Sequence, residues 1–240
     1  MGQYYKAIFL ESDGKTPTKF ALAHSVDCGI KLMEHSYIDN PLMNSVLNYL
    51  KNNGSSRLVW AGDYADPEDG TEKNLYEMTE GLPEIPYDTT SPHVRFLVNE
   101  TKHQFVDLWD VPDYTHRIAH PLSLLTAEGN GRGGGDYTGL NSKFVGLWSR
   151  DVISVMDEDW ENANKLHDMG YTEFEPEFVE NYEITRSFER SCKAFAKMLN
   201  DGDCLLLESS ADHIRELIKD LKAALPKKRY PRKTKTALVS

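Results

Sequence analysis

Glycine and charged side chains are concentrated in one stretch of the chain, residues 124–151. Between the two apolar runs of this stretch, glycine occupies positions 129, 131, 133, 134, 135 and 139. Because glycine adopts left-handed backbone conformations at no steric cost, such a loop can turn several consecutive N–H groups toward an anion. Arg132 stands among these glycines, and its guanidinium group suits a phosphate or a carboxylate. A long hairpin turn explains the same composition, so the residues leave both interpretations open.

Two short patterns recur in this stretch and earlier in the chain. Gly-Asp-Tyr occurs at 62–64 and at 135–137, and an apolar-Trp-small-x-Asp pattern ends at Asp63 and at Asp151. If the two apolar runs form neighbouring strands, these carboxylates would converge near Asp136, with two arginines opposite them. Such a mixture of groups can hold a polar ligand, bind a metal or position water. We predict these ligand-binding residues: Asp63, Tyr64, Glu128, Asn130, Arg132, Asp136, Arg150 and Asp151. The alternative is that the aspartates only cap turns.

Established phosphate and metal motifs fit the chain poorly. Residues 129–134 match Gly-x-Gly-x-x-Gly, but the helical pattern that a dinucleotide-binding fold requires does not follow. His116 and His120 are four residues apart, yet Pro121 follows directly and no glutamate completes a zinc motif. We predict no metal site and assign neither a cofactor nor a catalytic residue. Aromatic side chains could stack on a planar ligand or belong to the core: Trp60, Trp148, Tyr64 and Tyr137.

Charge is distributed unevenly along the chain. The formal net charge is -11, but residues 227–235 carry six basic and no acidic side chains, which leaves 21 basic against 38 acidic side chains before residue 227. An acidic body argues against a nucleic-acid surface outside the basic tail, because phosphate contacts require clustered Lys and Arg. Solubility explains the charge most simply. A second interpretation is a surface that binds a basic protein partner.

Membrane insertion and secretion are not expected. No apolar run approaches the roughly 20 residues that cross a bilayer, and residues 1–10 lack the basic start and apolar core of a secretory signal. The three cysteines, at 28, 192 and 204, show no paired spacing and resemble reduced thiols. We therefore expect a cytoplasmic protein.

Hydrophobic periodicity and turn residues predict the elements that position these side chains. Strands are expected at 3–11, 19–24, 30–35, 57–61, 94–98, 104–108, 122–125 and 144–148, with hairpins at 12–14 and 99–103. Asn40 and Pro41 predict the capped start of a helix that stops at Gly54. Further helices are expected at 71–80, 160–170, 188–199 and 214–225.

The order of these elements predicts an α+β fold, because strands come first and helices afterwards. A mainly antiparallel sheet is expected in residues 1–156. Residues 157–226 are expected to form an acidic helical region that packs on it, and residues 227–240 a basic, disordered tail.

Several motifs together resemble a group of uncharacterised proteins found in bacteria and their phages: MGQYYKA, KLMEHS, WAGDYAD and LLTAEGNGRGGGDY. The similarity covers roughly the first 155 residues in patches. The resemblance implies a bacterial or phage origin and supplies no activity and no site residues.

Two functions from different classes fit these observations. The first is a binding protein or hydrolase for a phosphate-bearing or nucleotide-like ligand, built around the glycine-rich stretch. The second is a phage-type interaction factor or inhibitor that uses its acidic surface to bind a host or phage protein. The residues do not decide whether the protein is an enzyme.

Overall fold

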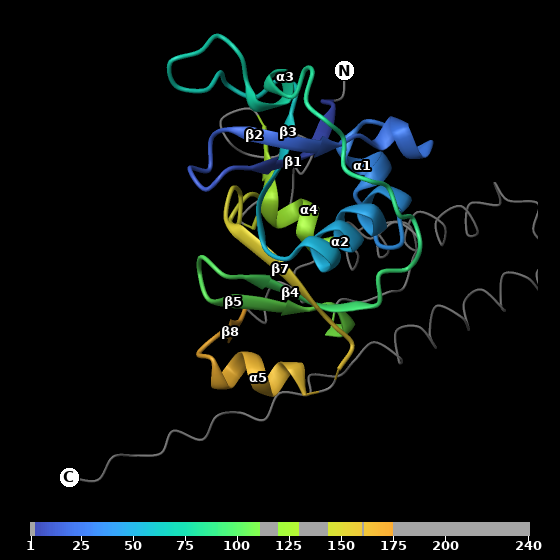
Figure 1. Ribbon diagram of the computed structural model, residues 1–240, viewed down its shortest axis with the longest axis vertical. Coiled ribbons are helices and arrows are strands. Elements are labelled where there is room, and N and C mark those ends of the chain that lie inside the picture. Colours follow the sequence, from blue (N-terminus) through green and yellow to red (C-terminus); the bar gives the residue numbers. More distant parts are fainter. Residues whose placement is uncertain (1–2, 111–119, 130–143, 160, 175–240) are drawn as a thin grey trace, which may run out of the picture. The chain divides into compact units, whose positions relative to one another are not determined.

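The computed structural model of the protein describes residues 3–110, 120–129, 144–159 and 161–174 (Figure 1). The strands are β1 (Tyr5–Leu10), β2 (Pro17–Ala21), β3 (Ser56–Gly62), β4 (Val94–Asn99), β5 (Gln104–Asp107), β6 (Ala127–Glu128), β7 (Val152–Asp157) and β8 (Thr172–Glu173). The helices are α1 (Leu32–His35), α2 (Pro41–Asn53), α3 (Leu75–Met78), α4 (Pro121–Thr126) and α5 (Asn162–Asp168), with 3-10 turns η1 (Ala23–Val26) and η2 (Leu108–Asp110).

The described strands form one eight-stranded sheet. Its order is β2-β1-β3-β7-β4-β5-β8, and β6 pairs with β3 beside this path. All pairs are antiparallel except β3 with β6 and β5 with β8. The predicted α+β fold with a mainly antiparallel sheet is therefore confirmed.

Helices pack against both faces of the sheet. One face, here called the Trp60 face, carries Phe9, whose ring meets Tyr49 of α2 edge-on at 4.7 Å between centroids. On the opposite face, the Val59 face, Leu75 of α3 packs in one apolar cluster with residues of β1, β2 and β3. Leu166 of α5 packs in a second cluster with residues of β4 and β5. Arg57 of β3 pairs with Val152 of β7, and Ser154 of β7 pairs with Val98 of β4. Both clusters therefore lie on the same face of the sheet, the Val59 face.

The predicted helix after Asn40 is confirmed as α2. The Asn40 side chain accepts a hydrogen bond from the backbone N–H of Leu42 at 2.8 Å, and Pro41 occupies the first helical position, where a missing N–H costs nothing. Gly54 ends the helix with φ of 83°. The expected hairpins are also present as β1/β2 and β4/β5.

Three predicted strands are wrong. Residues 30–35 contain α1, whose first turn is held because Glu34 accepts a hydrogen bond from the backbone N–H of Lys31. Residues 122–125 lie in α4, since His120 caps it and Pro121 begins it. Residues 144–148 form consecutive turns, with Gly146 at φ 75°. Apolar runs of this length fit a buried helix or turn as well as a strand.

The C-terminal predictions have a mixed outcome. The acidic helix expected at 160–170 is present as α5, and Gly170 follows it at φ 85°. Strand β8 then returns to the sheet beside β5. The helices expected at 188–199 and 214–225, and the basic tail, lie outside the described residues. Within the described part of the chain, no helix has the length and apolar character needed to span a membrane.

Candidate functional site

The parallel pair β3/β6 brings two distant glycine-containing segments to one edge of the sheet. Trp60 pairs with Ala127 and Ala61 pairs with Glu128. Because parallel strands run in the same direction, their carboxyl ends meet. Gly62-Asp63-Tyr64 therefore leaves β3 beside Gly129, which is buried and begins the glycine-rich stretch. In open sheets ligands bind outside the carboxyl ends of parallel strands, so this edge is the candidate site.

The side chain of Gln3 lies against Gly62 at this edge. A Cβ added to Gly62 would overlap the Gln3 amide, so a larger residue at position 62 would require the Gln3 side chain to move. Gln3 is 4% exposed, and its Oε1 accepts a hydrogen bond from the Tyr5 hydroxyl at 2.8 Å. Its Nε2 is fully buried and has no hydrogen-bond partner among the described residues. The site thus contains a buried donor that the described protein atoms do not satisfy.

Asp63 is held in place by the N-terminal strand. Its Oδ1 accepts a hydrogen bond from the backbone N–H of Tyr4 at 2.9 Å, and its own N–H donates to the Tyr4 carbonyl. The Asn74 side chain donates to the Asp63 carbonyl at 3.0 Å. Tyr64 is 48% exposed and Tyr4 is 39% exposed. Asp63 therefore fixes the backbone here, and the residue that it pairs with, Tyr4, and the residue that follows it, Tyr64, both have exposed side chains.

Arg150 and two glutamates form a buried ion network beside this edge. The guanidinium donates to both carboxylate oxygens of Glu68, at 2.9 and 2.5 Å. The guanidinium also binds the Glu128 carboxylate. Arg150 Nε donates to Glu128 Oε2 at 2.8 Å, and Arg150 Nη2 donates to Glu128 Oε1. Ser149 also donates to Glu128 at 2.8 Å. The network therefore joins the residue before Gly129 to the residues that end the glycine-rich stretch.

The charges in this network are strongly coupled. Burial by itself lowers the pKa of Arg150, but the hydrogen bonds and charges of Glu68 and Glu128 raise that pKa above its ordinary value. Arg150 also has φ of 65°, a conformation that costs a non-glycine residue about 1–2 kcal/mol. Removing one partner would leave buried charge unpaired. The network thus fixes the backbone at Arg150.

Asp63 and Asp151 do not converge, contrary to the expectation from their repeated pattern. The Asp151 carbonyl accepts from the backbone N–H of Leu58, whereas Asp63 follows β3 five residues later. At about 3.3 Å per residue, this separates the two by roughly 16 Å along the strand. The Asp151 carboxylate pairs instead with Lys102 and with the Asn99 side chain, the latter at 2.8 Å.

The two repeated tryptophans belong to the core. Trp60 and Trp148 are both 0% exposed, so neither ring presents a face to a ligand. The Trp60 indole N–H donates to Nε2 of His35 at 3.0 Å, and His35 Nδ1 lies 2.9 Å from the Gly29 carbonyl. His35 is therefore neutral with its proton on Nδ1. Burial lowers its pKa to about 4, against smaller opposing contributions from Gly29 and Glu34.

His120 caps a helix from a fully buried position. Its Nδ1 accepts a hydrogen bond from the backbone N–H of Leu122 at 3.1 Å and so caps α4. Burial lowers the pKa of His120 to about 3. Over the ranges that the structure describes, no group of three or more acidic, histidine or cysteine side chains is arranged to hold a metal ion.

Five of the eight predicted ligand residues are described by the structure. It brings Glu128 together with Arg150, but leaves Asp63 and Asp151 at different positions along β3. Asn130, Arg132 and Asp136 lie outside the described residues. Sequence reasoning missed both Glu68 and Gln3. No local pattern marks either residue, because the partners of Glu68 are distant in sequence and Gln3 is distinguished only by its missing partner.

Comparison of the chain with protein-family models, with curated proteins and with solved structures found no match.

Proposed function

We propose that the protein binds a small phosphate-bearing or nucleotide-like ligand at the carboxyl ends of β3 and β6. The observation that carries this proposal is the parallel register of Trp60 with Ala127 and Ala61 with Glu128. It sets Gly62 and Asp63 beside the start of the glycine-rich stretch, which the sequence separates by more than sixty residues. Backbone N–H groups of such a stretch suit phosphate oxygens, and Arg132 supplies a positive charge nearby in sequence.

The ion network supports the proposal through positioning. A ligand site works when the residues that carry it are held rigidly by neighbours. Arg150 ties Glu128, at the start of the glycine-rich stretch, to Glu68 of the 66–70 turn. A buried ion network is weak support for stability alone, because its desolvation cost is large. The network includes Glu128 and Arg150, which stand at the two ends of the glycine-rich stretch. This position favours a role in fixing the ends of that stretch over a role in stability alone.

Binding is tested by thermal unfolding of the full chain with inorganic phosphate, pyrophosphate, ribose 5-phosphate and the common nucleotides. A ligand at 100 times its dissociation constant adds about 2.7 kcal/mol of stability. The Arg132→Ala and Asp136→Ala variants should unfold at the wild-type temperature and lose the ligand-induced increase. Asp69→Ala, whose side chain is 85% exposed, is the matched control and should retain it. An absence of any increase with all of these probes would refute the proposal.

Hydrolysis is examined with the same probes. A hydrolase that activates water by general-base catalysis needs a group that can take a proton from it, and the Asp136 carboxylate is the candidate that the sequence supplies in the glycine-rich stretch. Release of inorganic phosphate from a nucleotide that binds would identify an enzyme. Binding without release, over hours and with added Mg²⁺, would identify a binding protein.

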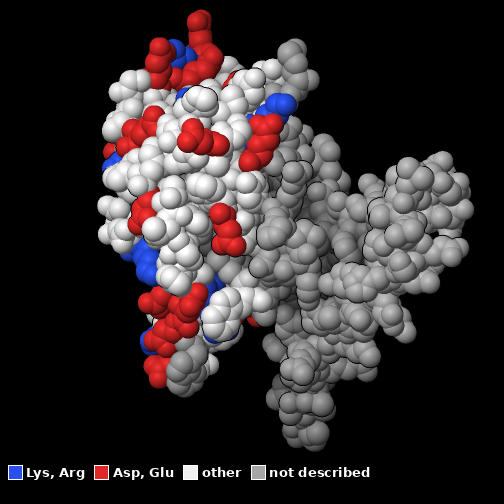
Figure 2. All heavy atoms as spheres, turned by 90° about the vertical axis from the view of Figure 1, so that its right-hand side faces the viewer, with Lys and Arg blue, Asp and Glu red and all other residues white. Residues whose placement is uncertain are grey.

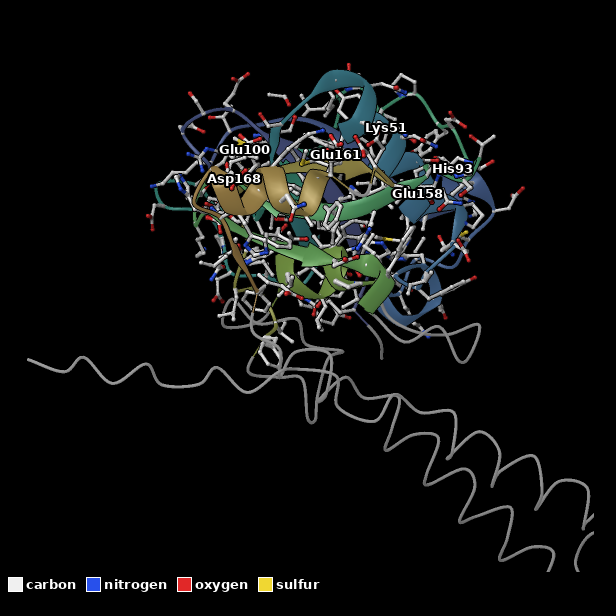
Figure 3. The ribbon with its side chains drawn as sticks, turned by 90° about the horizontal axis from the view of Figure 1, so that it is seen from below. Lys51, His93, Glu100, Glu158, Glu161 and Asp168 are labelled. Atoms are coloured by element: carbon white, nitrogen blue, oxygen red, sulfur yellow. The ribbon has the colours of Figure 1, made fainter. Side chains whose placement is uncertain are left out.

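A second function is favoured by the acidic surface. Acidic side chains outnumber basic ones on the side of the molecule that faces the viewer in Figure 2. Figure 3 shows Glu161 and Asp168 at the two ends of α5, and Glu158 close to His93, from which it is 3.7 Å away. Between residues 157 and 174, six acidic side chains accompany one lysine. Such a surface suits a basic protein partner, as in an interaction factor of a phage or its host, acting in the cytoplasm.

Charge reversal separates the two functions. Replacing Glu158, Glu161 and Asp168 by lysine together should abolish binding to a basic partner isolated from bacterial lysate. The same triple variant should leave any nucleotide-induced increase in unfolding temperature unchanged. Arg132→Ala should retain binding to the basic partner and lose the nucleotide-induced increase in unfolding temperature. A partner retained by the triple lysine variant would contradict the interaction function.

A further inference from the structure

We propose that Asn53, the last residue of α2, is a site of spontaneous deamidation, a covalent change that alters the link between α2 and β3. The dipeptide Asn53-Gly54 is the starting point. Glycine has no side chain to shield its backbone nitrogen, so this nitrogen reaches the amide of a preceding asparagine most readily. No other asparagine within the described ranges precedes a glycine, and the second such dipeptide, at 130–131, lies outside them. The inference does not depend on the proposed ligand site.

The reaction needs water and no other reagent. The Gly54 backbone nitrogen bonds to Cγ of Asn53, the Cγ–Nδ2 bond breaks, and ammonia leaves with the proton that Gly54 gives up. Water then opens the cyclic imide at either of its carbonyls. Opening at one carbonyl gives an aspartate with the normal backbone. Opening at the other gives isoaspartate, whose backbone runs through the former side chain and is longer by a methylene group.

The end of α2 is open to solvent, and two hydrogen bonds control access to the reacting atoms. Asn53 is exposed, and a Cβ added to Gly54 would meet no atom within 4 Å. In the closed helix the Gly54 N–H donates to the Leu50 carbonyl at 2.9 Å, and Asn53 Nδ2 donates to the Tyr49 carbonyl at 2.9 Å. Helix ends fray at low free energy. The reaction therefore proceeds from the state in which the last turn of α2 is open.

Other asparagines of α2 provide an internal comparison. Asn44 and Asn48 are 8% and 7% exposed, and their amides donate to backbone carbonyls of residues 88–90. Asn52 is exposed but precedes another asparagine. Within this helix Asn53 alone combines an exposed side chain with a following glycine, so the modification is expected at Asn53 and not at its neighbours.

The product alters a short connection in the fold. α2 ends at Asn53 and β3 begins at Ser56, where Ser56 pairs with Ile153 of β7. Residues 54–55 cannot absorb a longer backbone, so isoaspartate moves Gly54 away from the Leu50 carbonyl and shifts the chain where it enters β3. The aspartate product has a smaller effect: it places a negative charge at the C-terminal end of α2, where the helix dipole disfavours it.

The test follows the full-length protein during incubation at pH 7.5 and 37 °C, with peptide mapping by mass spectrometry. Asn53 should acquire the mass change of deamidation, while Asn44, Asn48 and Asn52 stay unchanged. A synthetic peptide of residues 49–57 gives the rate without the helix. The ratio of the rate in the folded protein to that in the peptide should equal the open fraction of the last turn. Hydrogen exchange of the Gly54 amide measures this fraction independently.

A variant of Lys51 tests the control by fraying. Lys51 Nζ donates to the Pro92 carbonyl at 2.9 Å and so ties the last turn of α2 to the rest of the protein. Lys51→Met should accelerate deamidation about two- to tenfold, as expected when the closed turn loses one hydrogen bond of ordinary net strength. Lys165→Met, which changes a lysine of α5, is the matched control and should leave the rate unchanged.

The structural effect is tested by comparing the aged protein with the Asn53→Asp variant, which reproduces the aspartate product. Aged protein enriched in isoaspartate should unfold at a lower temperature than Asn53→Asp and exchange its amides faster at residues 56–58. Equal behaviour of the two would refute the effect on the link between α2 and β3.

The remaining outcomes overturn the deamidation site itself. An intact Asn53, after the time that the peptide rate and the Gly54 exchange predict for its conversion, would do so. Equal conversion of Asn52 and Asn53 would show that the glycine has no influence. An unchanged rate in Lys51→Met would refute control by the last turn of α2.

Discussion

Arg150 and Glu68 are 82 residues apart in the sequence, yet the guanidinium of one makes two parallel hydrogen bonds to the carboxylate of the other. Glu128 engages the remaining edge of the same guanidinium. The side chains of Arg150, Glu68 and Glu128 are only 15%, 10% and 7% exposed. The Arg150 guanidinium thus pairs with two buried carboxylates and holds Glu68, in the segment that follows β3, against the end of the glycine-rich stretch.

Replacing Arg150 by methionine should strongly destabilise the protein. The change removes the Arg150 cation from two buried carboxylates, and removal of one partner from a buried ion pair costs about 3–5 kcal/mol. The free energy of unfolding, measured with urea at pH 7, should fall by this amount. Lys165→Met is the control, because Lys165 pairs with Asp159 at 3.3 Å on the surface and such pairs contribute about 0–1 kcal/mol. Equal effects of the two substitutions would show that the Arg150 network contributes no more than a surface pair.

The contact between Gln3 and Gly62 should appear as energetic coupling. Gly62→Ala alone should destabilise by about 1–3 kcal/mol, because the added methyl group overlaps the Gln3 amide. In the Gln3→Ala background the space is free, so the same Gly62→Ala change should cost less than half as much. A double-mutant cycle of urea unfolding measures the difference. Additive effects in that cycle would mean that the two residues do not share this space.

Stability should decrease as the pH falls below about 6.5, the ordinary pKa of histidine. His35 and His120 are neutral in the folded protein, with pKa values lowered to about 4 and about 3, whereas both bind protons in the unfolded chain. The free energy of unfolding is therefore highest above pH 6.5. It decreases progressively as the pH falls toward the pKa values of the two histidines in the folded protein. Each histidine then removes about 1.4 kcal/mol per pH unit.

This dependence is measured by urea unfolding at pH 7.5, 6, 5.5 and 5. His120→Asn is a suitable variant because asparagine also caps helices and does not titrate. It should reduce the slope of stability against pH by about half. An unchanged slope would contradict the assignment of His120 as a buried neutral group.

The cap of α2 should contribute measurably to stability. Asn40 is 0% exposed and supplies the acceptor for the first free N–H of the helix, and its amide also contacts the thiol of Cys28 at 3.4 Å. Asn40→Ala should lower the free energy of unfolding by about 0.5–2 kcal/mol. Asn40→Ser retains a capping oxygen and should lose less. Thermal unfolding followed by circular dichroism distinguishes the two, and equal losses would exclude capping as the cause.

Local features of the sequence predicted local structure well. Asn40, Pro41 and Gly54 identified α2 because the cap, the first helical residue and the stop all act within a few residues. The β1/β2 and β4/β5 hairpins followed for the same reason, since their partner strands are joined by short turns. The short apolar runs at 30–35, 122–125 and 144–148 were misassigned because such runs suit a buried helix as well as a strand.

The candidate site depended on relationships that no local pattern contains. The sequence marked the glycine-rich stretch, Asp63 and Arg150 as chemically interesting. Only the tertiary structure decided that β6 lies parallel to β3, that Glu68 rather than an aspartate faces Arg150, and that the Gln3 amide lies unpaired on Gly62. The β3/β6 pairing, the Glu68–Arg150 ion pair and the Gln3–Gly62 contact each join residues about sixty or more positions apart, and their stability comes from the packing of the whole sheet. A sequence pattern reports the properties of neighbours along the chain, whereas these contacts are made between neighbours in space.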